Sequence, residues 1–230
     1  MTGRMRISVI VPVMKEAEEI NRFIWHLGSL RKGNDVEIVI ADGDPHGSTL
    51  NAIKEGTVIG VLSQKGRGRQ MNAGAVAATG EILLFLHADT FLPSAAFERV
   101  VDVMLTGRYS GGAFNLGIDS GRTALRIVER AASIRSRITR IPYGDQAIFI
   151  RRDIFQDMGG FMDIPIMEDV DLMHRLKRAG HRIVIISNKV RTSPRRWEKE
   201  GIIYCTLRNW TLVMLYMLGV NPEKLARFYR

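Results

Sequence analysis

Short runs of apolar residues alternate with segments of helical spacing through the first half of the chain. The run 7–11 predicts a buried strand. Residues 16–30 predict a helix, because Ile20, Phe23 and Leu27 recur at steps of three and four. The same alternation predicts strands over 36–41, 58–62 and 81–86, and a helix over 69–79. Strand–helix repeats of this kind are typical of an α/β fold with a mostly parallel central sheet flanked by helices.

The second half of the chain is less regular, and no internal repeat or linker interrupts it. Its patterns predict strands over 110–118, 147–151 and 182–187, and helices over 122–141, 153–158, 168–179 and 200–218. A length of 230 residues is compatible with one large domain or two small ones, and the missing linker favours one.

Composition and charge narrow the class of protein. Apolar residues make up 46% of the chain, enough for a globular core, and the single cysteine, Cys205, cannot form a disulfide within the chain, which fits a reducing cytoplasm. The net charge of +9 favours anionic partners such as phosphate, nucleic acid or an anionic membrane. The apolar run 7–14 is not a signal peptide, because acidic residues follow it at once, and residues 210–220 are too short to span a bilayer.

Three polar clusters follow the predicted strands: Lys15–Glu16, Asp42–Gly43–Asp44 and His87–Ala88–Asp89. The carboxyl ends of parallel strands meet at one edge of a sheet, and ligands of such sheets bind there. We therefore expect the three clusters to converge on one site although they are dispersed in the sequence.

The local chemistry of these clusters permits more than one role. Asp89 can hold a hard cation such as Mg²⁺ or Mn²⁺ against a diphosphate, which is a better use than capping the helix that Pro93–Ser94 opens. Asp42 can accept a hydrogen bond from a base or ribose, or can simply shape the turn at the end of its strand. The local pattern leaves both roles of Asp42 open.

Three further segments have the same ambiguity. Glycines and arginines over 66–72, just before a helix, can bind an anion or form a solvated basic loop. The acidic residues over 168–171 can complement the helix dipole or supply a general base. Arg196 and Trp197 can clamp a pyrophosphate or stack on a sugar, or can belong to a loop anchored by one tryptophan.

Taken in order, these segments resemble glycosyltransferase family 2 with its GT-A fold, from Ile7 to about Trp197. The segment 9–16 resembles the first strand of the family and its Pro-Val-x-x-Glu turn, and Asp42 falls where the family aspartate contacts the base. His87–Ala88–Asp89 occupies the Asp-x-Asp position, and Glu168–Asp169 matches the Glu-Asp pair of the acceptor side. Arg196–Trp197 is similar to the end of the Gln-x-x-Arg-Trp element.

Four segments (66–74, 84–90, 143–146 and 167–169) resemble more closely a small bacterial branch of the family described as radical-SAM/selenodomain-associated transferases. The chain also departs from the family pattern. His87 replaces the first acid of Asp-x-Asp, Pro45–His46–Gly47 replaces Ser-Thr-Asp, and Ser193 stands where glutamine is frequent.

The resemblance implies an inverting glycosyltransferase that uses Mn²⁺ or Mg²⁺ and a UDP- or GDP-linked sugar. It implies a single GT-A-like domain over 1–230, with a nucleotide-binding half (1–90), an acceptor and catalytic half (91–198) and a C-terminal helical extension (199–230). The implied site has Asp169 and Glu168 as catalytic residues and Asp89 on the metal. The implied donor-binding residues are Pro12, Val13, Glu16, Asp42, Arg67, Arg69, Asn72, His87, Ala88, Arg196 and Trp197, and the acceptor-side residues are Gly144, Asp145 and Gln146.

Two other functions are weighed against this one. A nucleotidyltransferase with a related core would carry a glycine-rich loop after the first strand, where this chain has Pro12–Glu16. A non-catalytic module could bind an anionic membrane through the arginines of 122–141, which could equally form a solvated face or a homodimer contact. We expect a cytoplasmic protein, able to sit at the inner face of the membrane, with no nucleic-acid partner and an acceptor that could be lipid-linked.

Overall fold

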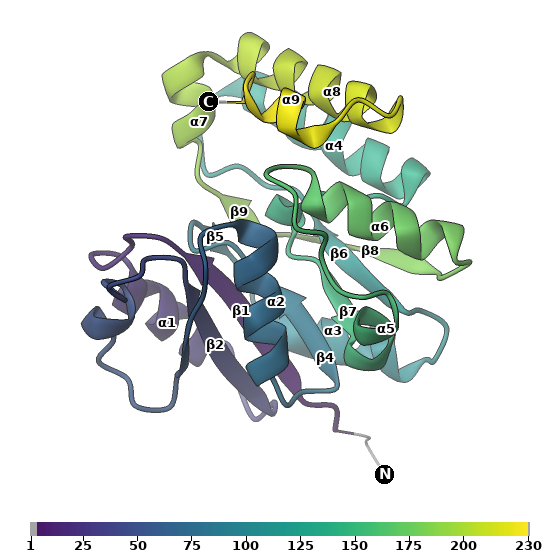
Figure 1. Cartoon of the computed structure of the whole chain (residues 1–230). Helices are drawn as coiled ribbons and strands as arrows, with labels where there is room; N and C mark the ends of the chain where they lie inside the picture. The colour runs from purple at the N-terminus through teal and green to yellow at the C-terminus, as the bar shows by residue number, and fades with distance from the viewer. Residues whose placement is uncertain (1–3, 230) are drawn as a thin grey trace.

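The computed structural model describes residues 4–229, and within them seven strands form one twisted sheet in the order β3-β2-β1-β4-β7-β6-β8 (Figure 1). The strands are β1 (Ile7–Val13), β2 (Val36–Asp42), β3 (Ile59–Leu62), β4 (Ile82–Phe85), β6 (Gly111–Asn115), β7 (Phe149–Arg151) and β8 (Ile183–Lys189). β7 runs antiparallel to β4 and β6, and the other pairs are parallel. The mostly parallel α/β sheet predicted from the sequence is confirmed.

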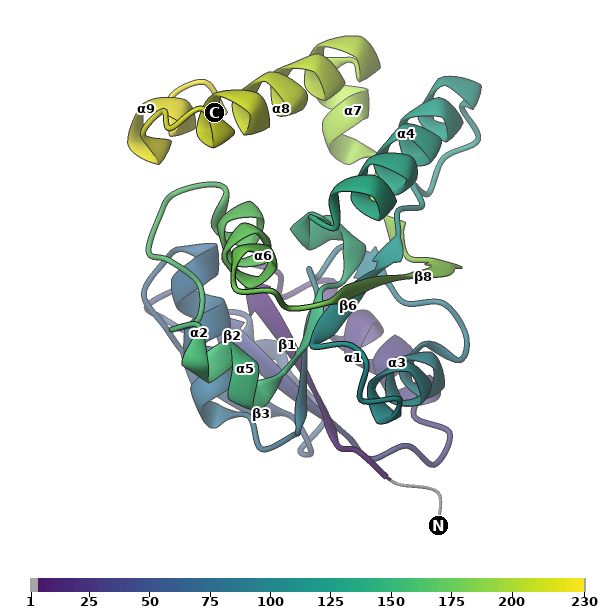
Figure 2. The ribbon, with the colours of Figure 1, turned by 90° about the vertical axis from the view of Figure 1, so that its right-hand side faces the viewer.

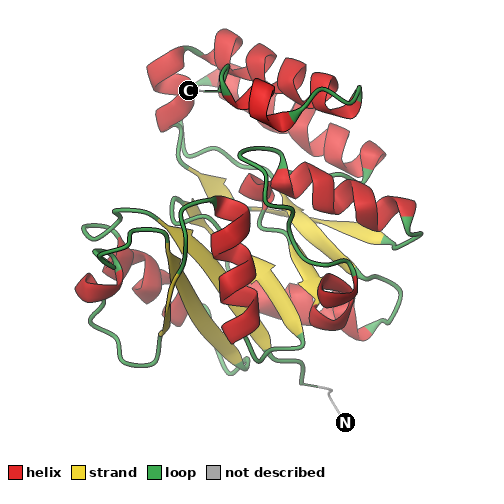
Figure 3. Cartoon of the chain, viewed as in Figure 1, coloured by secondary structure: helices red, strands yellow, loops and turns green. Residues whose placement is uncertain are grey.

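Helices cover both faces of this sheet (Figure 3). The longer ones are α1 (Ile20–Ser29), α2 (Arg67–Ala77), α3 (Ala96–Leu105), α4 (Thr123–Thr139), α6 (Glu168–Arg178) and α8 (Ile202–Met217). The short ones are α5 (Arg152–Asp157), α7 (Arg195–Glu200), α9 (Pro222–Ala226) and the 3-10 turns η1 (Leu50–Ala52) and η2 (Gly144–Gln146). α1 and α3 pack on one face, and α2, α5 and α6 pack on the other.

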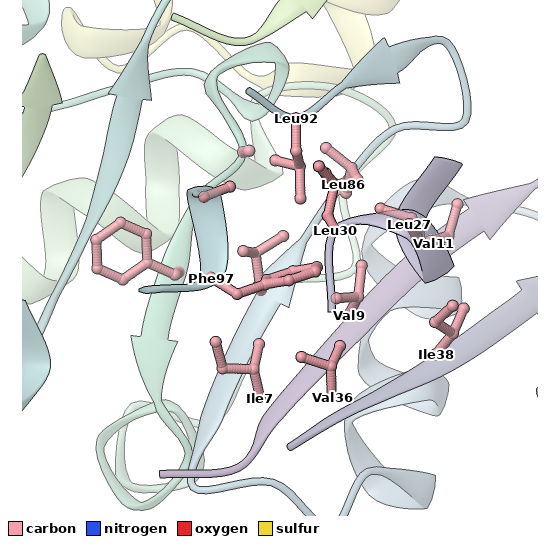
Figure 4. Close-up of a cluster of buried hydrophobic side chains, with 14 of the residues drawn as sticks. Ile7, Val9, Val11, Leu27, Leu30, Val36, Ile38, Leu86, Leu92 and Phe97 are labelled. Carbon is pink, nitrogen blue, oxygen red and sulfur yellow. The ribbon is translucent and has the colours of Figure 1, made fainter. Parts of the chain in front are cut away.

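The alternation of side chains along β1 explains how one strand serves both layers. Val9 and Val11 point into the cluster that holds the α1 and α3 side chains, around Phe97 (Figure 4), while Ile10 points into the cluster on the opposite face. α2 lies close to this strand because Gly74 has no side chain: a Cβ there would lie 2.5 Å from Ile10 Cγ2. This close approach fixes the position of the α2 N-terminus at the carboxyl edge of the sheet.

Several helix boundaries differ from the sequence prediction by one to four residues, and two of them have a clear physical reason. The helix expected over 16–30 begins at Ile20, because Lys15 takes a positive φ of 61° and the Glu16 amide donates to Thr49 Oγ1, which ties the preceding residues into a turn. The helix expected over 200–218 begins at Ile202, because Gly201, at φ 89°, separates it from α7.

A small antiparallel pair, β5 (Thr90–Phe91) and β9 (Arg191–Thr192), joins the two halves of the chain. It was not predicted, and it places the basic segment after residue 192 beside Asp89, whose carbonyl accepts a hydrogen bond from the Ser193 amide at 3.2 Å. Beyond it, α8 and α9 pack on the start of α6 through a cluster of Ile166, Val170, Leu212 and Leu225. Among residues 4–229, no helix is both long enough and apolar enough to cross a bilayer.

Candidate active site

The carboxyl ends of β1, β2 and β4 lie side by side, because β1 pairs in parallel with both of its neighbours. This register brings the three polar clusters of the sequence to one edge of the sheet, as predicted. Glu16 and Asp44 line a hollow of about 410 Å³ together with Ser48 and Arg195. A narrower groove that Glu16 shares with Asp89 runs on from it.

A second pocket, of about 190 Å³, opens on the other side of Asp89. Segments that are far apart in the sequence build its walls: the start of α2, the loop after β4, the turn η2, the start of α6, α7 and α8. Among the predicted site residues, it brings together Arg67, His87, Asp89, Gly144, Asp145, Asp169, Arg196 and Trp197. The pocket therefore unites metal, acceptor-side and catalytic candidates from both halves of the chain.

Asp169 is held at the first turn of α6 by two backbone amides. Its Oδ1 accepts from the Val170 amide at 2.8 Å, and its Oδ2 accepts from the amide of Gly144. Gly144 makes this approach possible, because a Cβ there would lie 2.9 Å from His87 Nε2 and 3.2 Å from Asp169 Oδ2. The carboxylate is thus fixed in orientation while its residue still lines the pocket.

Glu168, unlike Asp169, does not line the pocket and instead pairs with Arg67. The Glu168 side chain is 4% exposed, and its Oε1 lies 3.2 Å from Arg67 Nε. Burial alone would lower the pKa of Arg67, but Glu168, Tyr229 and Asp169 together outweigh it and raise that pKa. Arg67 is therefore a permanent cation that Glu168 holds against the pocket wall.

Asp145 faces the pocket in an unusual electrostatic state. Burial, and then the charges of Asp169 and Asp89, raise the pKa of Asp145 to about 6. Its Oδ1 and the indole Nε1 of Trp197 are buried without a hydrogen-bond partner among the described residues. Buried polar atoms that lack partners in a pocket are expected to bind a ligand's polar groups.

His87 is neutral at physiological pH, because burial, and then the cations Arg67 and Arg196, lower the pKa of its imidazole to about 3. Burial and the neighbouring charge of Asp89 also raise the pKa of Glu16. Carboxylates that repel one another beside a neutral imidazole fit a divalent cation. Within residues 4–229, however, no three His, Cys, Asp or Glu side chains are arranged to hold a metal ion by themselves.

Other predicted residues lie outside the pocket and stabilise the scaffold in this structure. The buried Asp42 carboxylate accepts from the backbone amides of Asp44, Thr49 and Leu50 at 2.9–3.3 Å, so it shapes the loop after β2. Val13 is buried at the end of β1, directly after Pro12, and its carbonyl accepts a hydrogen bond from Gln70 Nε2 at 2.7 Å. Ala88 lines the groove beside Asp89.

Three more predicted residues bind protein groups. Arg69 makes a two-pronged ion pair with Asp163 at 2.6 and 2.7 Å on the surface, away from the pocket. Asn72 exchanges hydrogen bonds with the backbone of Phe161 at 2.8 and 2.9 Å. The fully buried Gln146 donates to the Phe114 carbonyl at 2.9 Å.

The sequence did not reveal several residues that line the pocket. Tyr143 lies within the recognised segment 143–146 and Ser193 was noted as a departure from the family pattern, but neither was assigned to the site. Asn209, Val213 and Tyr229 carry no sequence signal, because the packing of the C-terminal helices alone brings them there. The Tyr229 hydroxyl accepts a hydrogen bond from Arg196, whose guanidinium lies 4.6 Å from the ring centroid.

Comparison with known proteins tests the family. Residues 8–160, more than half of the chain, match the family model named Glycosyl transferase family 2. The chain belongs to glycosyltransferase family 2. It is 31% identical over 124 residues to an uncharacterised glycosyltransferase of Nostoc sp., a match that covers 51% of this chain and 38% of the relative. It is also 24% identical over 178 residues to a dolichol-phosphate mannosyltransferase of Pyrococcus furiosus, with coverage of 73% and 49%.

Solved glycosyltransferase structures resemble most of the chain. A mannosyltransferase of Pyrobaculum calidifontis in complex with GDP-Man and Mn²⁺ matches with a TM-score of 0.67 and 19% identity, over 83% of this chain and 57% of the other. S. aureus TarS in complex with UDP-GlcNAc matches with a TM-score of 0.64 and 18% identity, over 82% and 58%. These likenesses show the GT-A fold, and the chain spans only about half the length of these proteins.

Proposed function

We propose that this family-2 chain transfers a sugar, with inversion, from a nucleotide-diphosphate donor to an acceptor hydroxyl. One observation carries the proposal: a single pocket joins Asp89, at the edge of the sheet, to Asp169 and Asp145 on the facing wall, with Arg67 and Arg196 beside them. In this proposal, residues 1–90 bind the donor and residues 91–198 supply the acceptor and catalytic side. The C-terminal extension, 199–230, contributes one wall of the pocket through Asn209, Val213 and Tyr229.

The donor nucleoside belongs in the hollow between Glu16, Asp44 and Ser48. Asp42 acts there as a positioning residue, because three backbone amides of the loop after β2 depend on its carboxylate. Arg195, which lines both the hollow and the groove toward Asp89, adds a cation along the path of the diphosphate. The complexes of the neighbours with GDP-Man and UDP-GlcNAc support a nucleotide sugar as donor.

Asp89 is the residue that would hold Mn²⁺ or Mg²⁺. The ion, when bound, neutralises charge that develops on the leaving diphosphate. Because one carboxylate is a small donor set, the ion would depend on the donor diphosphate for tight binding. The Mn²⁺ in the Pyrobaculum neighbour supports a divalent ion in this fold.

Asp169 is the proposed general base. It removes the proton of the acceptor hydroxyl, whose oxygen forms a bond to the anomeric carbon while the bond from that carbon to the diphosphate oxygen breaks. The Gly144 amide holds the carboxylate in position, and Asp145 and Trp197 offer free hydrogen-bonding atoms to the acceptor. Arg67 and Arg196 stabilise the departing negative charge.

A thermal-shift screen of UDP and GDP, each with and without Mn²⁺, tests the donor side of this proposal. A nucleotide diphosphate that binds the folded chain raises the melting temperature by mass action, and Asp89→Asn should abolish the part that depends on Mn²⁺. Asp119→Asn, which changes a carboxylate farther along the same groove, is the matched control. If neither nucleotide shifts the melting temperature under any condition, the proposed donor class is wrong.

A further inference from the structure

The helix α8 exposes a stripe of large apolar side chains that its role in the pocket does not explain. Ile203, Leu207, Trp210, Met214 and Met217 recur at steps of four and three residues, so they lie along one side of the helix. Their exposed fractions run from 45% at Trp210 to 75% at Ile203, and no charged side chain interrupts the stripe. A contiguous exposed apolar surface of this kind marks an interaction site.

The stripe belongs to a helix that is already anchored. On its other side, Cys205 and Leu212 are buried, and Leu212 packs into the cluster that joins α8 to the start of α6. Asn209 and Val213 line the proposed active-site pocket. The helix is therefore fixed in place by its inner side, and the exposed stripe is free to contact another partner.

Exposed cations lie on two helices that contact α8. α4 packs against α8 and exposes Ile127, Ile134 and Ile138 in alternation with Arg130 and Arg137. α9, which follows α8, exposes Lys224 beside the acidic Glu223, and Arg227, directly after α9, is exposed as well. The three helices gather at the end of the molecule that lies away from the N-terminus (Figures 1 and 2).

We propose that α8, together with the flanking sides of α4 and α9, docks on the anionic surface of a lipid bilayer. Apolar and aromatic side chains rimmed by lysine and arginine are the signature of a helix that lies in the membrane interface. The basic rim and the net charge of +9 supply the attraction to anionic headgroups. A second copy of the chain fits less well, because a symmetric contact would bring the basic rims of both copies together.

The geometry gives this surface a consequence for the acceptor, and that consequence alone rests on the proposed function. One side of α8 would lie in the membrane interface while the other lines the pocket, so about 10 Å, the diameter of a helix, separates bilayer and pocket. A lipid-linked acceptor could then present its hydroxyl to Asp169 without leaving the membrane.

Vesicle co-sedimentation of the full chain tests the docking itself without any assay of activity. We expect the wild type to sediment with vesicles of phosphatidylcholine and phosphatidylglycerol and to remain in the supernatant with phosphatidylcholine alone. The triple variant Leu207→Ser, Trp210→Ser and Met214→Ser should lower the partition coefficient at least about tenfold. Arg130→Gln combined with Arg227→Gln should lower it several-fold at low salt.

Matched controls keep the result decisive. Trp25→Ser removes from α1 a tryptophan that is more exposed (73%) than Trp210 (45%), and Arg99→Gln removes an exposed cation from α3, so both variants should sediment like the wild type. Circular dichroism confirms folding of each variant, and brominated lipid should quench Trp210 in the wild type. The proposal is overturned if the wild type ignores anionic vesicles or if the triple variant still binds them. It is also overturned if light scattering shows a dimer that the triple variant abolishes.

Discussion

Replacing Asp145 with asparagine should stabilise the protein at neutral pH, because the folded state keeps this carboxyl in an unfavourable place. Burial, and then the charge of Asp169, raise its pKa from 3.8 to about 6. A folded-state pKa above the unfolded value contributes stability that is complete below pH ~4 and is lost as the pH rises through ~6. A shift of about two pKa units corresponds to about 3 kcal/mol as an upper bound. Because pocket water solvates part of the charge, we expect about 1–2 kcal/mol.

Urea unfolding of the wild type and of Asp145→Asn, followed by circular dichroism from about pH 4 to about pH 8, measures this difference directly. The two free energies of unfolding should agree at the acidic end and diverge as the pH rises, with the asparagine variant more stable. Asp102→Asn, an exposed position on α3, should run parallel to the wild type at every pH. A constant difference between Asp145→Asn and the wild type across the range would refute the proposed burial of charge.

Three further substitutions test other parts of the site. Gly144→Ala should lower kcat by about 10–100-fold, because its Cβ would displace the base by a few tenths of an ångström, whereas Gly28→Ala, which meets no atom within 4 Å, should leave kcat unchanged. Glu168→Gln should cost about 1–2 kcal/mol in unfolding free energy, because it removes the buried carboxylate that pairs with Arg67, whose side chain is 38% exposed and stays partly solvated. Asp163→Asn, which breaks an exposed pair, should leave the free energy of unfolding close to that of the wild type. Tyr229→Phe should tighten nucleotide-diphosphate binding about fivefold in calorimetry, since the lost hydroxyl frees an arginine for phosphate; unchanged affinity would contradict this.

Much of the fold followed from periodicity, because the four parallel strands β1 to β4 are short, mostly apolar runs and helical patterns separate several of them. The boundaries of the helices and the short strand pair were less predictable. The start of α1 depends on a hydrogen bond from Glu16 to Thr49, and the β5–β9 pair joins residues about a hundred positions apart. Both are tertiary contacts that leave no local pattern, so sequence spacing could not reveal them.

The site residues also fall into those that the sequence could place and those that it could not. Glu16, Asp44 and Asp89 could be placed together because the ends of parallel strands must meet. Arg69 and Asn72 belong to a promising glycine-rich segment, yet each binds a partner near residue 160 instead of the pocket. Local sequence shows that a side chain can bind an anion or an amide, but only the fold decides which partner lies within reach.

The most direct test of the central claim is donor turnover by the wild type and by Asp169→Asn. The purified chain, with Mn²⁺ and either GDP-mannose or UDP-N-acetylglucosamine, should release nucleoside diphosphate slowly even without an acceptor, because water can replace the hydroxyl. Asp169→Asn should bind the donor with unchanged affinity and lose at least about a hundredfold in turnover. Turnover of the asparagine variant near the wild-type rate would show that Asp169 is not the base and would contradict the account.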